Sequence, residues 1–367
     1  MRWLRSFKLT ISRLFTSIAG KMRTRPASHA GYTGSWYHAN PAALADQLDD
    51  FLKRVPDNLD GIGLPVPGAR VIIAPHAGYD WSGPCAAWAY KAFDLSAAKR
   101  VFVLGPNHKI RRLESCLVST FASYATPFGN LVVDHVTTNE LKQTGSFADF
   151  PTWAEIAEHS LEMHMPYLWK RLEQTFGGSS DKFPPIIPIL VGSLDLEDEQ
   201  FYGRLLAPYL SDPENAFIVS SDFCHYGHPH CYQPQCDREK QFLHNPDGGK
   251  HGKGETLGIK LDTNITPETP PHEIIKWLDD QSIASISTGV HEKFYTNMME
   301  SKNTVCGRHP IGVVMAAMEE VAKNNTKHES EDGKGKFKLI RYDRSSLVQE
   351  VNNEDFSVSY VSAYAII

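Results

Sequence analysis

The fold class is decided by the stretch Arg70-Val-Ile-Ile-Ala-Pro-His76-Ala-Gly-Tyr79. Its continuous apolar run ends at Pro75, and residues 83–93 then show helical spacing. The same pattern recurs with apolar runs at 99–104, 185–191 and 217–220. Continuous apolar strands are typical of sheets that are covered on both faces, and here they alternate with helices. The sequence therefore predicts an α/β fold with a mainly parallel central sheet and helices on both faces.

Metal-competent side chains follow three of these runs. His76 follows the first and His108 the second, whereas Asp222 and His225 follow the run that ends at Ser220. Because open α/β sheets bind ligands beyond the carboxyl ends of their strands, we expect these side chains to meet at one edge. A single histidine in such a place is more often a turn or capping residue. Recurrence after three runs favours a binding site.

A cysteine is the third candidate ligand. Cys306 precedes Gly307-Arg-His-Pro310 and an apolar helix start, and a helix N-terminus with Arg308 and His309 nearby favours a thiolate. The alternative is a buried, inert thiol. Histidine nitrogen and cysteine sulfur suit iron, copper or zinc, whereas magnesium and calcium prefer oxygen. We predict a metal pocket built from His76, His108 and Cys306.

Other motifs argue against several enzyme classes. The segment Glu158-His-Ser-Leu-Glu-Met-His164 differs by one residue from the metalloprotease pattern His-x-x-Glu-His. The chain has no dinucleotide-binding glycine motif after a strand, no P-loop and no Gly-x-Ser-x-Gly. The cysteines and histidines of 224–236 do not match zinc-knuckle spacing. Protease, nucleotide-binding and serine-hydrolase functions are therefore not expected.

Composition limits the partners. The 367 residues are 41% hydrophobic and 22% charged with a formal net charge of -6, as in ordinary globular proteins. Basic residues form no long stripe after the N-terminus, so a nucleic-acid partner is not expected. No apolar run approaches the ~20 residues that cross a bilayer, so we expect no membrane span. Six dispersed cysteines predict reduced thiols and a cytoplasmic location, with the nucleus also compatible.

Residues 1–26 are predicted to be a basic N-terminal extension. The first acidic residue is Asp46, and the extension is either disordered or a targeting segment that would send the chain to mitochondria. Translation from Met22 is a further alternative. Residues 27–367 are predicted to form a single α/β domain. Polar stretches at about 245–272 and 323–336 are interpreted as inserted surface loops.

An ordered series of motifs resembles the Memo family, which is named for mediating cell motility downstream of receptor tyrosine kinases. The motifs are Gly34-Ser-Trp36-Tyr37, Ala74-Pro-His76-Ala-Gly-Tyr79, Leu104-Gly-Pro-Asn-His108, Glu158-His-Ser-Leu-Glu-Met-His-Met-Pro-Tyr167, Ser220-Ser-Asp222-Phe-Cys-His225 and Val305-Cys306-Gly-Arg-His-Pro310. The resemblance implies the fold of class III extradiol dioxygenases, non-haem iron enzymes that cleave catechol rings. It also implies that His76 and His108 are iron ligands, His159 a pocket histidine and His225 the catalytic acid/base.

The position of Cys306 separates this chain from the ring-cleaving enzymes. Those enzymes complete their metal site with a glutamate, where the Memo-type pattern has Cys306. Ring cleavage is therefore not expected. The resemblance instead implies iron- or copper-dependent redox activity, linked to signalling or redox homeostasis. In this interpretation His76, His108 and Cys306 bind the metal, and Asp222, His225 and His159 are the catalytic residues. Asp222 and His225 hydrogen-bond to the oxygen species bound at the metal or ligate it, and His159 shapes the pocket.

The alternative is a non-catalytic adaptor that binds peptides in the same cleft. Aromatic Trp36, Tyr79 and Trp81 beside histidines suit an extended ligand. After His225 the chain has His228-Pro-His-Cys231, where the family pattern supplies arginines. Because arginine is the usual partner of phosphate, this departure argues against a phosphotyrosine ligand.

Overall fold

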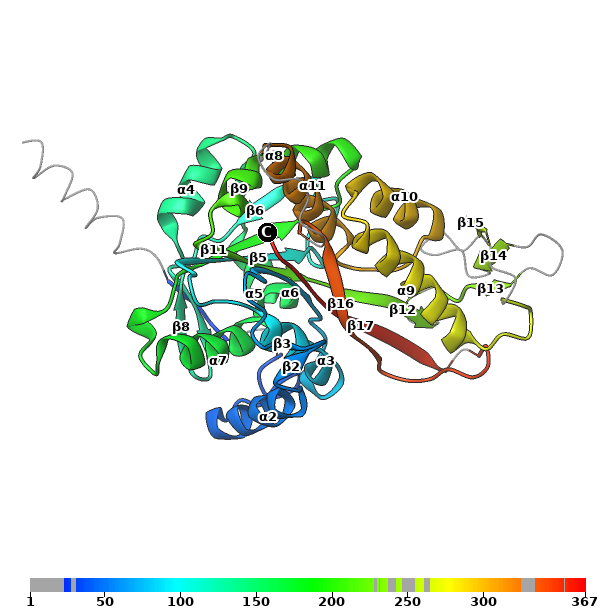
Figure 1. Cartoon of the computed structure of the whole chain (residues 1–367), viewed down its shortest axis with the longest axis horizontal. Coiled ribbons are helices and arrows are strands. Elements are labelled where there is room, and N and C mark those ends of the chain that lie inside the picture. The colour runs from blue at the N-terminus through cyan, green and yellow to red at the C-terminus, as the bar shows by residue number, and fades with distance from the viewer. Residues whose placement is uncertain are drawn as a thin grey trace, which may run out of the picture.

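A computed structural model describes residues 23–27, 31–227, 230, 232–236, 242–245, 255–260, 265–324, 334–352 and 354–367. Within these residues the main sheet has nine strands (Figure 1). They are β4 (Val71–Ala74), β5 (Arg100–Pro106), β6 (Cys116–Val118), β9 (Phe147–Asp149), β10 (Ile186–Val191), β11 (Asn215–Ser220), β12 (Asp222–Gly227), β16 (Phe337–Arg344) and β17 (Phe356–Ala365).

The strand order is β12-β17-β4-β11-β5-β10-β6-β9, and β16 pairs with β17. The centre, β4-β11-β5-β10, is parallel throughout. Antiparallel strands flank it, with β17 beside β4 and β6 beside β10. This topology confirms the predicted α/β class with a mainly parallel sheet. It places the carboxyl ends of β4, β11 and β5 next to one another.

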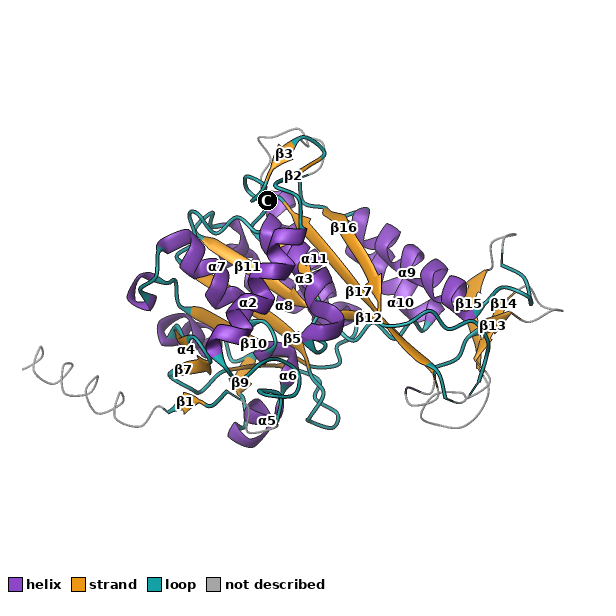
Figure 2. Cartoon of the chain, turned by 90° about the horizontal axis from the view of Figure 1, so that it is seen from below, coloured by secondary structure: helices purple, strands orange, loops and turns teal. Residues whose placement is uncertain are grey.

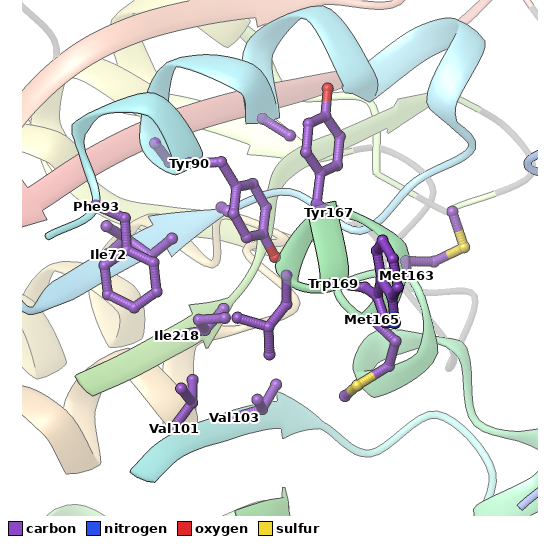
Figure 3. Packing of buried hydrophobic residues seen from close by; sticks show 14 of the residues in the cluster. Ile72, Tyr90, Phe93, Val101, Val103, Met163, Met165, Tyr167, Trp169 and Ile218 are labelled. Atoms are coloured by element: carbon purple, nitrogen blue, oxygen red, sulfur yellow. The ribbon is translucent and has the colours of Figure 1, made fainter. Parts of the chain in front are cut away.

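The central strands are buried on both faces, as their continuous apolar sequences require. Ile72, Val103 and Ile218 point into one hydrophobic core, and their chain neighbours Ile73 and Phe217 point into the other. Figure 3 shows the first core, where Tyr90 and Phe93 lie over Ile72, Val101, Val103 and Ile218.

Helices cover both faces of the sheet (Figures 1 and 2). They are α2 (Pro41–Arg54), α3 (Tyr79–Ala92), α4 (His135–Gln143), α5 (Thr152–Ala157), α6 (His159–Glu162), α7 (Met165–Phe176), α8 (Leu196–Ser211), α9 (Pro271–Ser287), α10 (His291–Ser301) and α11 (Arg308–Asn324). Helices α2, α3 and α7 contribute to the first core, and α8 and α11 to the second. No helix among the described residues is long and apolar enough to cross a membrane.

The fold includes the last residues of the predicted N-terminal extension. Strand β1 (Thr24–Arg25) pairs with β7 (Ser123–Thr126), which pairs with β8 (Gly129–Val132). Residues 1–22 lie outside the described part of the chain. The Arg25 side chain is buried. Arg25 therefore belongs to the folded part of the chain, although the boundary predicted at residue 26 assigned it to the extension.

The polar stretch 245–272 differs from its prediction as a loop. Residues Glu255–Lys260 form β15, which pairs with β14 (Phe242–Asn245), and β14 pairs with β13 (Gln235–Cys236). Leu257 and Ile259 are buried, because their alternation lets one face of β15 join a third core. Figure 1 shows this small sheet at one end of the molecule. The stretch 323–336 begins within α11, and residues 325–333 lie outside the described residues.

Candidate metal centre

Three neighbouring strands deliver the predicted pocket residues. His76 and His108 follow β4 and β5, and Asp222 follows β11 after a single intervening residue. His225 differs from its prediction, because it lies within β12 rather than just beyond a strand. Since β12 begins at Asp222 and pairs with β17, it carries His225 along the edge of the sheet.

Three histidine rings converge in this pocket. One nitrogen atom from each of His76, His108 and His159 lies within 4.8 Å of the others. The rings of His108 and His159 stack with centroids 4.3 Å apart, and each lies 5.4 Å from the ring of His76. His159 begins the short helix α6, so a segment far from β4 and β5 in sequence supplies the third ring. The geometry can hold one cation between three imidazoles.

Hydrogen bonds fix the proton on His76. Its Nδ1 lies 2.6 Å from the Ser220 hydroxyl, and that hydroxyl donates to the carbonyl oxygen of Ser160 at 2.7 Å. A serine hydroxyl has one proton to donate, so the Ser220 oxygen accepts from Nδ1–H of His76. Nε2 is left with a free lone pair. Burial lowers the pKa of His76 well below its usual range, and His159 and His108 lower it further.

Glu158 orients His108 in the same way. Its Oε1 accepts from His108 Nδ1 at 2.9 Å, and its Oε2 accepts from the His108 backbone N–H at 2.8 Å. Burial raises the pKa of Glu158, but the hydrogen bond and charge of His108, with His159 and the Ser160 N–H, bring it to about 2. A carboxylate behind an imidazole is a common arrangement at metal sites. Sequence reasoning missed this role, although Glu158 stands in the motif that includes His159.

His159 is the least constrained of the three rings. Its buried Nδ1 has no hydrogen-bond partner among the described residues, although Glu158 Oε1 lies 3.4 Å away. Burial, with smaller contributions from His108 and other neighbours, lowers the pKa of His159 to about 3. Trp36 packs edge-on against the ring at 5.1 Å and Tyr32 at 5.5 Å. A neutral, aromatic-walled imidazole with an unpartnered nitrogen fits a cation ligand.

Cys306 lies at the edge of the pocket, next to His76. Its Sγ lies 3.2 Å from His76 Nε2 and 3.5 Å from the backbone oxygen of Asp222. Gly307 makes this approach possible, because a Cβ there would lie 2.3 Å from Ser221 Cβ. Cys306 is not part of the group of three nitrogen atoms. The third member of that group is His159, which the structure adds to His76, His108 and Cys306 as a candidate ligand.

The prediction that Cys306 is a thiolate is corrected by its surroundings. Burial raises the pKa of this thiol well above its usual range, and the charge of Asp222 raises it further. Arg308 is not among the groups that shift this pKa, and its Nε donates to His309 Nε2 at 3.0 Å. A bound metal ion would change the balance, since cations deprotonate the thiols that coordinate them.

Asp222 and His225 support the pocket from β12. Asp222 Oδ1 accepts from the backbone N–H of His76 at 2.8 Å and from that of Ala77 at 3.3 Å. Burial raises the pKa of Asp222. The Nδ1 of His225 lies 2.8 Å from the Phe223 carbonyl oxygen, which can only accept, so Nδ1 carries a proton and the neutral ring has its lone pair on Nε2.

A buried histidine outside the pocket, His164, gives the fold a pH dependence. The pKa of His164 is lowered to about 3 by burial, whereas an unfolded histidine has a pKa of about 6.5. Between these values the unfolded chain binds a proton that the folded chain does not, so stability falls as pH falls, by about 1.4 kcal/mol per pH unit. His164→Gln should flatten the slope of the urea unfolding free energy between about pH 4 and pH 6 by this amount.

A matched control uses the partner of His164. The Tyr90 hydroxyl lies 2.8 Å from Nδ1 of His164. Tyr90→Phe removes this hydrogen bond and leaves the titrating ring, so it should lower stability but keep the slope. An unchanged slope in His164→Gln would show that the ring is protonated in the folded protein.

The sequence match to known proteins includes all of the pocket residues. A family model described as Memo-like protein matches residues 25–364. Protein MEMO1 of Danio rerio is 36% identical over 351 residues, which cover 95% of this chain and 100% of that protein. Protein MEMO1 of Homo sapiens is 35% identical over 345 residues, which cover 94% of this chain and 98% of that protein. The protein memo-1 homolog of Caenorhabditis elegans is 36% identical over 340 residues, which cover 92% of this chain and 81% of that protein.

Proposed function

The chain belongs to the Memo family, and from that membership and the pocket geometry we propose that it binds one iron or copper ion and is a metal-dependent oxidoreductase. The proposed ligands are His76, His108 and Cys306, and the proposed role is in signalling or redox homeostasis. One observation carries the proposal: nitrogen atoms from three imidazoles lie within 4.8 Å of one another, with the Cys306 sulfur 3.2 Å from one of them.

The imidazole nitrogens of His76, His108 and His159 fit such an ion. Two ligands about 2.0–2.3 Å from one ion lie within about 4.6 Å of each other, close to the 4.8 Å spread of these three nitrogens. The Cys306 sulfur lies beside His76 Nε2 but outside this group. Imidazole and thiolate donors select iron, copper or zinc over magnesium and calcium. A bound iron or copper ion would supply one-electron redox chemistry. Cys306 stands in place of the carboxylate of the ring-cleaving enzymes, and this argues against ring cleavage.

The surrounding residues have separate roles in this proposal. Ser220 and Glu158 hold the Nδ1 protons of His76 and His108, so that both Nε2 atoms face the ion as lone pairs. In its neutral form His225 offers Nε2 as a proton acceptor. Asp222 holds the turn after β4 in place, and Trp36 with His159 forms a wall that limits water.

Metal analysis of anaerobically purified protein tests the site. We expect wild type to hold close to one iron or copper ion per chain and Cys306→Ala to lose most of it. Cys85→Ala is the matched control, because Cys85 is buried in α3 and its Sγ contacts Ser362 rather than the pocket. If wild type and Cys306→Ala hold the same substoichiometric metal, the assignment of Cys306 is wrong. Loss in His159→Gln but not in Cys306→Ala would move the site to the three histidines.

A peptide adaptor is the second candidate function. It is favoured by a cavity of about 520 Å³ beside the pocket, lined by Trp36 and the largely exposed Trp81. Peptide capture with and without a chelator separates the two functions, because an adaptor does not need a redox metal. Capture that disappears with the chelator would contradict a purely adaptor role.

A further inference from the structure

A cavity between the start of α3 and the start of β17 has a distinct chemistry. We name it the acidic groove, and its volume is about 520 Å³. It is lined by Ser35, Trp36, Ala77, Gly78, Asp80, Trp81, Ser345, Ser346, Glu354, Asp355, Phe356, Val358 and Tyr360. Three of these residues are acids, and none is lysine, arginine or histidine. Its size lies within the usual range for ligand sites, about 300–1,000 Å³.

The three carboxylates have no cationic partner among the described residues. Asp80 Oδ1 accepts from the amide of Gln47 at 2.8 Å, and Asp355 Oδ2 accepts from the amide of Asn352 at 2.7 Å. These amide partners are neutral. Within the described part of the chain, no ion pair involves Asp80, Glu354 or Asp355. Their negative charge is therefore left for a ligand.

Two nearby positive features do not cancel this charge. Arg344 precedes Ser345 in the chain, but its guanidinium donates to the backbone oxygen of His272 and lies 5.7 Å from the centre of the Tyr342 ring. The N-terminus of α3 carries roughly half a positive charge, and Asp80 in its first turn offsets it. Among the residues that the structure describes, those lining the acidic groove carry a net negative charge.

Aromatic side chains stand beside these acids. Trp81 is 62% exposed and Phe356 is 51% exposed, so both have ring surface that a ligand can cover. A lysine or arginine cation over an indole face is attracted by the ring as well as by neighbouring carboxylates. The apolar stem of such a side chain also covers ring surface. Acids and exposed aromatics together select a cation on an apolar stem.

We propose that the acidic groove binds a peptide segment that carries an arginine or lysine next to an apolar residue. The inference deepens the peptide-binding alternative and does not require the metal. Trp36 lines the groove and packs against His159, and Ala77 follows His76, so the bound segment lies beside the metal pocket. A phosphorylated peptide is disfavoured, because its charge meets three carboxylates.

The test uses fluorescence anisotropy with metal-depleted full-length protein and two labelled peptides of equal length. One peptide carries Arg-Leu-Lys at its centre, and in the other the two basic residues are replaced by glutamate and phosphotyrosine. We expect the basic peptide alone to bind, with an affinity that falls as salt rises. Equal or tighter binding of the phosphorylated peptide would overturn the proposal.

Variants locate the binding. Combined Asp80→Asn, Glu354→Gln and Asp355→Asn should weaken it about tenfold, and Trp81→Ala about threefold. The matched control combines Glu197→Gln, Glu292→Gln and Glu300→Gln, which remove three exposed acids outside the groove and should leave binding unchanged. Metal-depleted Cys306→Ala should also bind the basic peptide normally. A failed metal proposal would appear in the metal content of this variant, whereas a failed peptide proposal would appear in the anisotropy. Equal loss in the groove and control variants would show a nonspecific charge effect and overturn the assignment.

Discussion

Replacement of Arg25 by alanine is expected to lower the free energy of unfolding by about 3–5 kcal/mol. The guanidinium forms an ion pair with Glu162 at 2.9 Å, and both side chains are 1% exposed. It also donates to the backbone oxygens of Glu155 and Glu158 at 2.9 Å each. Removal of Arg25 would leave the Glu162 carboxylate buried without its partner, which costs more than the pair itself contributes.

Urea unfolding of metal-free protein measures this effect. Arg23→Ala is the matched control, because Arg23 is exposed and two residues away. Arg25→Lys should fall between the two, since lysine keeps the charge but cannot reach several backbone oxygens at once. If Arg25→Ala and Arg23→Ala change stability equally, by less than about 1 kcal/mol, the buried ion pair does not stabilise this segment.

The role of Arg25 could not be predicted from local sequence. The acid-free N-terminal stretch contains several basic residues, and nothing near Arg25 distinguishes it from Arg23. Its partner Glu162, the last residue of α6, lies more than a hundred positions away, and only the tertiary fold brings the two together. In the sequence, Glu162 stands out only as part of a protease-like spacing. Long-range ion pairs leave no periodic signal in a sequence.

The central sheet and the positions of two pocket histidines could be predicted, because their signal is local in the sequence. Continuous apolar runs identify buried parallel strands, and the polar residue after each run must lie at the carboxyl edge of the sheet. This placed His76 and His108 together. The convergence of His159 required the position of α6, and the raised pKa of the Cys306 thiol required its burial beside Asp222, which only the folded structure shows.

Glu158→Gln is expected to lower metal affinity by about 10–100-fold, the usual effect of losing the carboxylate behind a metal-binding histidine. Glu158 accepts hydrogen bonds from His108 Nδ1 and from the backbone N–H groups of His108, His159 and Ser160. A glutamine has one acceptor oxygen and presents its NH₂ group to the remaining donors. The His108 ring would lose the contact that fixes its proton on Nδ1 and directs Nε2 into the pocket.

Competition with a chromogenic chelator measures this loss, and Glu155→Gln provides the comparison. Glu155 is also buried, but it accepts from the Tyr124 hydroxyl at 2.6 Å rather than from a pocket histidine. Both substitutions remove a buried charge, so both should reduce stability, whereas only Glu158→Gln should reduce metal affinity relative to wild type. Equal affinities in the two variants would show that Glu158 caps α6 without orienting His108. A larger loss in Glu158→Gln would instead identify His108 as a ligand whose ring orientation depends on this carboxylate.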